Sequence, residues 1–399
     1  MATNKDKRRD PPEPPNPYDL RQIYEEMELY LINSMRRNLK RHMKEEERLG
    51  FAWEQWQKAT LRNIEQFRRE CREIIGEMST ETQRKVDEVL NGSYDSGYST
   101  VERAAERQGA EKTVGVSLPE DGKNTAPVGK SANPEQDFFK ANPRKLDALT
   151  EAVKEDLNEA NKAVYRKMDD IYRQTVFKAT YKMSSGALTL QQAVDEASKE
   201  LLAQGIKCIQ YKNGARFDIV SYVEMAIRTA SQRARMLGEG AFRDKHQLWL
   251  VRVSSHTATC SLCQPWQGEI LIDDVFSHPS EDFIQTNDGK YKCVSEAIKA
   301  GLFHPSCRHT LYTYYPGDRE PIVASPEESA RLYKAEQKLR TLERSIRQAK
   351  REVASAIDPK NQEQAKKKLR HCQALLREHL KQNPELKRNR WREKEHVQT

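Results

Sequence analysis

Two short motifs that combine cysteine and histidine constrain this chain more than any other feature of its sequence. Cys260 and Cys263 form Cys-x2-Cys, and about forty residues later His304 and Cys307 form His-x2-Cys inside HPSCRH. With two residues between them, the side chains of each pair can converge on one ion, and together they make the Cys3His set of closed tetrahedral zinc sites. The motifs therefore predict one structural zinc ion bound by Cys260, Cys263, His304 and Cys307, with all four positions filled by protein.

Spacing alone does not decide between neighbouring donors, so His256, Cys293 and His309 are substitute ligands. A Cys-x2-Cys pair is also used in redox chemistry, and a free cysteine packs as a small apolar side chain, as we expect for Cys293. A catalytic zinc is the weaker interpretation, because no His-x-Glu motif precedes Cys260 and His-Glu-x-x-His does not occur in the sequence. Nearby acids could suggest paired catalytic carboxylates, but we expect them at turns and on the surface: Asp273, Asp274, Glu281 and Asp282.

Composition favours a helical protein with several parts. The 399 residues are 32% charged and 37% apolar, and the mean hydropathy is −0.90, which suits long exposed helices more than one compact globule. The sequence contains no apolar run long enough to span a membrane and no apolar stretch of a secretory signal near its N-terminus, so we expect neither. Four of the seven cysteines cluster as ligands do, which indicates folding in a reducing cytoplasm.

The positive charge lies in the last part of the chain. Residues 326–399 hold 20 Lys or Arg against 11 Asp or Glu, a balance of +9, although the whole chain carries only +8. The tail also has an apolar seam whose members alternate spacings of three and four: Leu332, Ala335, Leu339, Leu342, Ile346, Ala349, Val353 and Ala356. After Asp358-Pro359 a second stripe follows, so we predict an antiparallel helical hairpin or a coiled-coil arm that pairs with another chain.

Periodicity and breaks divide the rest of the chain. The fold class we predict is α+β and predominantly α-helical, with long N-terminal helices, a small β-containing Cys/His module and the helical tail. The N-terminal helices carry an aromatic stripe that includes Trp53, Trp56 and Phe67, and we expect an interruption at NGSYDSGYS. In chain order the segments are a disordered 1–16, a helical domain 17–112, a linker 113–139, a helical domain with a short hairpin 140–245, the Cys/His module 246–325 and the basic tail 326–399.

Three stretches of this sequence carry a resemblance. GARFDIVSYVEMAIRTASQRARMLGEGAF, VRVSSHTATCSLCQPWQGEI and AGLFHPSCRHTLYTYYPG resemble the signature of the phage minor capsid protein 2 family, which is similar to the Mu F-like head morphogenesis proteins of tailed phages. The likeness covers roughly residues 17–325, with its specific motifs in 214–317. The family's Cys-x-x-Cys falls on Cys260 and Cys263, and its His-Pro-x-Cys falls on His304 and Cys307.

The resemblance implies a low-copy structural protein of the phage head, found in the virion and, during assembly, in the host cytoplasm. Its partners would be the portal protein, the major capsid protein or both, and it would act in head morphogenesis or in packaging and retaining DNA. We expect no enzymatic activity and no membrane contact, and the tail could support self-association. The alternatives are a nucleic-acid-binding protein that uses its basic tail non-specifically, and a metal-dependent hydrolase or nuclease with His256 or His309 as base.

Overall fold

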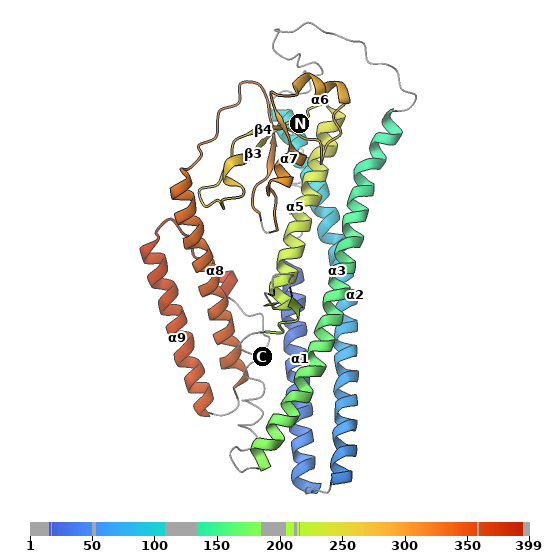
Figure 1. Cartoon of the computed structure of the whole chain (residues 1–399), viewed down its shortest axis with the longest axis vertical. Coiled ribbons are helices and arrows are strands. Elements are labelled where there is room, and N and C mark those ends of the chain that lie inside the picture. The colour runs from blue at the N-terminus through green and yellow to red at the C-terminus, as the bar shows by residue number, and fades with distance from the viewer. Residues whose placement is uncertain are drawn as a thin grey trace, which may run out of the picture. The chain divides into compact units, whose positions relative to one another are not determined.

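Long helices dominate the structure, a computed structural model of the whole chain (Figure 1). It describes residues 16, 18–49, 53–107, 134–184, 205–210, 214, 216–305, 307–356 and 359–393. Small sheets accompany the helices, which confirms the predicted α+β, predominantly helical class. None of the helices in these ranges has a stretch long and apolar enough to cross a membrane.

The chain forms two compact units, and each collects stretches that are far apart in the sequence. Unit 1 contains Met1–Pro17, Val86–Val153 and Ala226–Ala330, and unit 2 contains Tyr18–Lys85, Lys154–Met225 and Arg331–Thr399. The predicted division of the chain into consecutive segments stays a prediction.

Three long helices supply most of the N-terminal half: α1 Tyr18–Leu49, α2 Trp53–Arg107 and α3 Pro134–Ser184. In unit 2, α1 buries an apolar stripe at helical spacing, which follows from its i, i+4 pattern: Leu20, Ile23, Met27, Leu31, Met35 and Leu39. Phe67 is fully buried and stacks on Tyr172 with ring centroids 4.3 Å apart. Phe67 is therefore a core residue of unit 2, while the side chains of Trp53 and Trp56 lie outside the described residues.

The predicted interruption of α2 at NGSYDSGYS is wrong, because the helix continues without a break to Arg107. Gly97 in this stretch makes a close contact with α5, Ile219–Lys245, and does not end the helix. A Cβ atom on Gly97 would lie 2.1 Å from the carbonyl oxygen of Arg235, and one on Gly238 would lie 2.0 Å from that of Tyr94. The two helix backbones thus touch through reciprocal glycines, which outweighs the intrinsic cost of glycine in a helix, about 1 kcal/mol each.

A four-stranded sheet with the order β5-β4-β3-β6 forms the centre of unit 1. The strands are β3 Leu250–Val253, β4 Ile270–Ile272, β5 Lys292–Cys293 and β6 Leu311–Thr313. β3 pairs antiparallel with β4 and β6, and β4 pairs parallel with β5. The apolar core between this sheet and its neighbours includes Met236, Val251, Val253, Cys263, Leu271, Val294, Leu302, Cys307 and Leu311.

Short elements fill the connections of this sheet: a 3-10 helix η2 Gln264–Trp266, α6 Glu281–Asn287 and α7 Val294–Lys299. The stretch 277–291, which is polar in sequence, contains α6, and the side chain of Ser280 caps that helix by accepting the N–H of Phe283. In unit 2, β1 Ile209–Gln210 pairs with β2 Arg216–Phe217 as the predicted short hairpin, and Gly214 between them has φ +81°. Residues 190–204, for which the sequence favours a further helix, lie outside the described residues.

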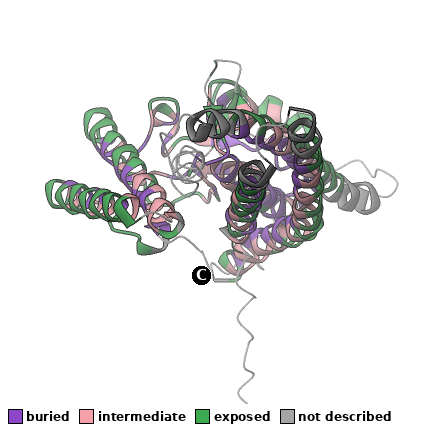
Figure 2. Cartoon of the chain, turned by 90° about the horizontal axis from the view of Figure 1, so that it is seen from below, coloured by how far each residue is buried: buried purple, intermediate pink, exposed green. Residues whose placement is uncertain are grey.

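The tail folds as an antiparallel hairpin of α8 Pro326–Ser355 and α9 Pro359–Gln382, followed by a 3-10 turn η3 Arg390–Glu393. Buried residues of the two helices form one apolar core, and Figure 2 colours the chain by burial. That core contains Leu339, Leu342, Ile346, Ala349, Cys372 and Leu376. Of the two arrangements we predicted for the tail, the structure shows the hairpin within one chain.

Candidate metal centre

The sheet brings the two predicted motifs together. β3 ends at Val253, shortly before the Cys-x2-Cys turn, and β6 begins at Leu311, shortly after the His-x2-Cys turn. Val253 and Leu311 are direct partners in the antiparallel β3–β6 ladder, so the turns at these strand ends must lie side by side. Residues 44 apart in sequence, Cys260 and His304, are thereby brought within contact distance.

Each motif is a tight turn closed by backbone hydrogen bonds. In the first turn, the N–H groups of Cys263 and Gln264 donate to the carbonyl of Cys260 at 3.2 and 3.0 Å. In the second turn, the N–H of Cys307 donates to the carbonyl of His304 at 2.9 Å. Such turns direct both side chains of a pair to the same side, which is what ion binding requires.

The route into the second turn uses unusual backbone angles. Gly301 has φ +107° and Phe303 has φ +57°, a region that non-glycine residues seldom adopt. Phe303 is buried in the core of unit 1, so its side-chain packing offsets the strain of this conformation. The consequence is a sharp change of direction that places His304 next to the first turn.

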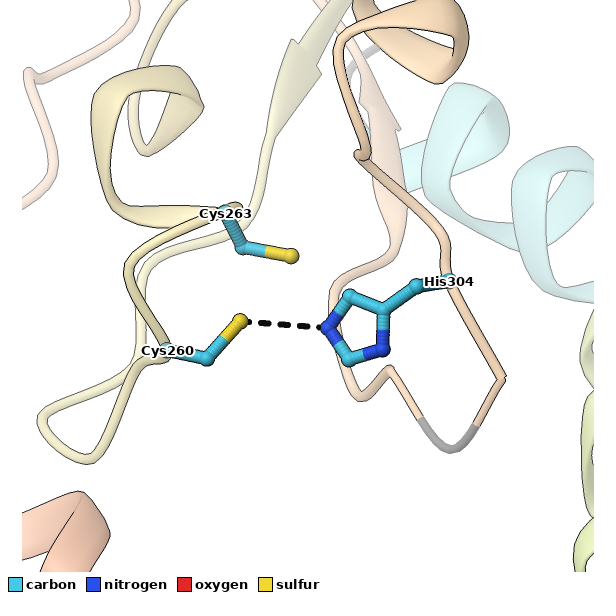
Figure 3. A group of neighbouring side chains, drawn as sticks. All are labelled: Cys260, Cys263 and His304. Atoms are coloured by element: carbon cyan, nitrogen blue, oxygen red, sulfur yellow. Dashed lines mark hydrogen bonds between the residues drawn. The ribbon is translucent and has the colours of Figure 1, made fainter. Parts of the chain in front are cut away.

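The donor atoms form two overlapping groups. In the first group, Cys260 Sγ lies 3.1 Å from His304 Nε2, with Cys263 beside them (Figure 3). In the second group, Cys263 Sγ lies 3.6 Å from Cys307 Sγ, and His309 joins them. Within each group all ligand atoms lie within 4.8 Å of one another, and Cys263 belongs to both.

The four predicted ligands are therefore adjacent, but they do not form one group by themselves. Cys307 lies with Cys263 and His309, and His304 lies with Cys260 and Cys263. Cys293 lies in neither group, because it sits at the junction of β5 and α7 as the residue preceding that helix. Three thiols and a histidine fit the donor chemistry of a structural zinc ion.

The surroundings favour the ionised form of one thiol in each turn, Cys260 in the first and Cys307 in the second. Burial opposes ionisation of Cys260, but the N–H groups of Cys263 and Leu262 and the ring of His304 outweigh it, so its pKa is lowered. The pKa of Cys307 is lowered chiefly because Cys263 donates a hydrogen bond to it, and the pKa of Cys263 is raised by the same contact. Cys263 thus holds the proton that a bound cation would displace.

His256 takes part in the surroundings and in neither donor group. Its Nε2 lies 3.0 Å from the carbonyl oxygen of Arg308, and its ring is 4.8 Å from that of His309. Because a carbonyl oxygen only accepts, Nε2 of His256 carries its proton in this arrangement. Burial lowers the pKa of His256. With its Nε2 proton held by a carbonyl, His256 has no free base nitrogen on that side.

The expectation that Asp273 lies at the surface is wrong. Its side chain is fully buried, and Arg243 of α5 donates to it at 2.9 Å, as do the Ser277 hydroxyl at 2.7 Å and the Phe276 N–H at 2.9 Å. Its partner lies 30 residues earlier in the chain, so no local pattern in the sequence reveals it. One signal was available, since Arg243 falls on the buried face of α5, at helical spacing from Met236.

The other acids near the motifs also have structural roles or lie at the surface. Asp274 accepts the N–H of Ser295 at 2.9 Å in the first turn of α7. Glu281 and Asp282 are exposed in the first turn of α6, as predicted, where their charge favours the helix dipole. These four acids therefore do not form a pair of carboxylates directed at the cysteines.

Comparison with models of known protein families gives a match. The family model described as phage minor capsid protein 2 matches residues 16–381, nearly the whole chain. No curated protein matches, and neither does any solved structure.

Proposed function

Because this chain belongs to the phage minor capsid protein 2 family, we propose that it is a minor component of a tailed-phage head that works at the portal or on the inner capsid surface. There it would act in head morphogenesis or in packaging and retaining DNA. Its partners would be the portal protein, the major capsid protein or both. The family supports a structural role in the phage, and the more specific location and step are our proposal.

We also propose that Cys260, Cys263, His304 and Cys307 bind one zinc ion whose role is to hold the sheet of unit 1 together. The observation that carries this proposal is the contact between the two turns, with Cys260 Sγ 3.1 Å from His304 Nε2 and Cys263 Sγ 3.6 Å from Cys307 Sγ. Cys263 and Cys307 are buried in the apolar core. Buried thiolates favour a structural ion over one that exchanges substrate and water.

The architecture supports a structural protein over a hydrolase. A metal-dependent hydrolase needs an open coordination position and a base near it. Here Asp273 is saturated by Arg243, Ser277 and Phe276. In the described residues around the cysteines, the polar groups hold turns and strands in place, which favours a scaffold.

Purified heads provide the test of the proposed location. Quantitative mass spectrometry of DNA-filled heads should find this chain at a low, fixed copy number, and chemical cross-linking should join it to the portal or the major capsid protein. Heads assembled without it should show reduced yield or reduced DNA content. Absence of the chain from both procapsids and filled heads would remove the proposal.

The basic tail supports a second candidate function, non-specific contact with DNA. In α9 the buried apolar side chains enter the hairpin core, while several basic side chains are exposed: Lys366, Arg370, Arg377 and Lys381. Contacts of this kind to phosphate weaken with salt, with a slope of about −0.9 per phosphate on duplex DNA. Changing these four residues to Gln should flatten the salt dependence, and binding that persists unchanged in high salt would contradict this role.

A further inference from the structure

The interior side of the metal centre contains a fifth donor, His309, which the proposed Cys3His set does not use. His309 is only 4% exposed, and its Nδ1 lies 3.4 Å from Cys307 Sγ. The ligand atoms of Cys263, Cys307 and His309 lie within 4.8 Å of one another, as do those of the first group, which contains His304. The ring thus faces two buried thiols, where an imidazole nitrogen is a suitable ligand.

The backbone of His309 is fixed on both sides. Its carbonyl accepts a hydrogen bond from the side-chain amide of Gln232 in α5, and its N–H points to Cys307 Sγ at 3.4 Å. The next residue, Thr310, donates its N–H to the Ser254 hydroxyl at 2.9 Å, directly before β6 begins. Helix α5 and the β3–β6 ladder therefore position the ring, and the position does not depend on the ion.

Gln267 offers an acceptor to one nitrogen of His309. The side-chain oxygen of Gln267 accepts the backbone N–H of His256 at 2.6 Å and the Thr259 hydroxyl at 2.9 Å. Because a backbone N–H can only donate, this oxygen and not the amide nitrogen occupies that place. The same oxygen lies 3.5 Å from His309 Nε2, a long contact that favours a proton on Nε2. With an ion bound, His309 Nδ1 would then be the unprotonated nitrogen, and it faces the thiols.

His304 shows the reverse arrangement. Its Nδ1 lies 2.9 Å from the carbonyl oxygen of Pro305, so Nδ1 carries a proton, and Nε2, which faces Cys260 Sγ at 3.1 Å, is the nitrogen that would bind an ion once the ion has displaced any proton there. Histidines that bind metals usually donate their other N–H to a carbonyl or carboxylate in this way. Both histidines thus meet that condition, from opposite sides of the same thiols.

From this geometry we propose that His309 is a nitrogen ligand of the same ion, through Nδ1, and that His304 and His309 are alternative fourth ligands for Cys260, Cys263 and Cys307. The inference rests on the proposed zinc site and adds a second histidine to it. Since the structure supplies five donors for a four-coordinate ion, the outer turn that carries His304 can move away while the ion stays bound through the inner histidine.

Cobalt binding to the full chain tests this assignment. Co²⁺ would be titrated into metal-depleted protein, and its affinity and visible spectrum compared among wild type, His304→Ala, His309→Ala and the double variant. Each single variant should keep one tetrahedral, thiolate-bound cobalt with affinity lowered roughly 10- to 100-fold, and the double variant should lose far more. His256→Ala is the matched control, because His256 neighbours His309 but belongs to neither donor group.

A second measurement needs no substitution. This is an advantage because replacing a buried residue such as His309 can disturb the fold. Long-range nitrogen–proton NMR of the zinc-loaded wild type, labelled at histidine, reports the tautomer of each ring. We expect His309 with its proton on Nε2 and His304 with its proton on Nδ1. A proton on Nδ1 of His309, or wild-type cobalt affinity in His309→Ala, would overturn the inference while leaving the zinc site intact. If wild type binds no cobalt, the zinc site and this inference both fail.

Discussion

The sheet module of unit 1 and the α8–α9 hairpin of unit 2 are stabilised in opposite ways. The hairpin buries a regular seam of apolar side chains from two helices of 30 and 24 residues. The module has strands of only two to four residues, and its core includes the thiols of Cys263 and Cys307. Short strands bury little area by themselves, so this region depends on convergent contacts between distant turns. The stability of the module should therefore depend on bound metal, whereas that of the hairpin should depend only on packing.

The sharpest way to break this contrast is to replace the shared thiol, Cys263→Ser. The zinc ion should be lost together with a stabilisation on the order of 10 kcal/mol, so the module unfolds while the hairpin stays folded. Elemental analysis and hydrogen exchange of residues 250–313 against 326–382 would measure both. Cys293→Ser is the control, because Cys293 lies in neither donor group. Retention of metal and of amide protection in Cys263→Ser would show that the thiols only pack.

The hairpin should lose stability through a cavity instead. Leu376 is fully buried in its core, whereas the adjacent Leu375 is 44% exposed. Leu376→Ala should cost about 2–5 kcal/mol of unfolding free energy, and Leu375→Ala well under that. Denaturant unfolding followed in the presence and absence of a chelator would test it. A hairpin whose loss of stability depends on chelator, or equal effects of the two substitutions, would contradict the distinction.

Unit 2 also contains a buried carboxyl that should make its stability depend on pH. Glu28 accepts the N–H of Ile206 at 2.5 Å and lies 3.4 Å from Arg351. Burial raises the pKa of Glu28 from 4.5 to about 7, despite the lowering effect of Arg351. Between these two values the folded state holds a proton that the unfolded state lacks. Its stabilising contribution is therefore complete below about pH 4.5 and is lost as pH rises through 7.

Glu28→Gln should remove this dependence. Between pH 4.5 and 8 the unfolding free energy of unit 2 should fall by about 3 kcal/mol less than in wild type. Glu343, whose pKa burial also raises to about 7, leaves a residual slope. Chemical unfolding at several pH values gives the measurement, with Glu363→Gln as control on the exposed face of α9. The assignment fails if the variant and wild type have parallel pH profiles.

The smallest effect should come from a partly exposed ion pair in unit 2. Arg68 contacts Asp169 through two hydrogen bonds of 2.8 and 3.1 Å. Asp169→Asn should lower the unfolding free energy by about 0.2–1 kcal/mol at low salt, and by less at high salt because the pair is screened. A double-mutant cycle with Arg68→Met isolates the pair. A coupling energy several times larger, and insensitive to salt, would show that the pair behaves as a buried one.

The parts of the fold that could be predicted from sequence are those set by local periodicity. The seam Leu339, Leu342, Ile346 and Ala349 predicted a helix with one buried face, and this face forms the hairpin core. The motifs likewise indicated which turns should meet. What local reasoning could not supply was the partner of each polar group. Arg243 reaches Asp273 from another element, and His309 is positioned by Gln232 and Gln267, which no spacing rule connects to it.

The glycines of α2 show the same limit of local reasoning. By itself Gly97 suggests a weak point in a helix, and only the carbonyl of Arg235 in α5 shows why it is there. Once the neighbouring backbone is known, the residue is explained by steric exclusion and not by flexibility.

The reciprocal glycine contact also predicts which substitutions in α2 and α5 the folded protein tolerates. In a library of variants selected for folded protein, almost every amino-acid substitution at Gly97 and Gly238 should disappear, because even alanine would place its Cβ about 2 Å from a backbone carbonyl oxygen. Gly76 lies in the same helix as Gly97, yet a Cβ there would meet nothing within 4 Å. Alanine at Gly76 should be enriched, since it favours the helix by about 1 kcal/mol. The substitutions tolerated at Gly76 and Gly97 would thus show where a neighbouring backbone packs closely against α2 and where it does not.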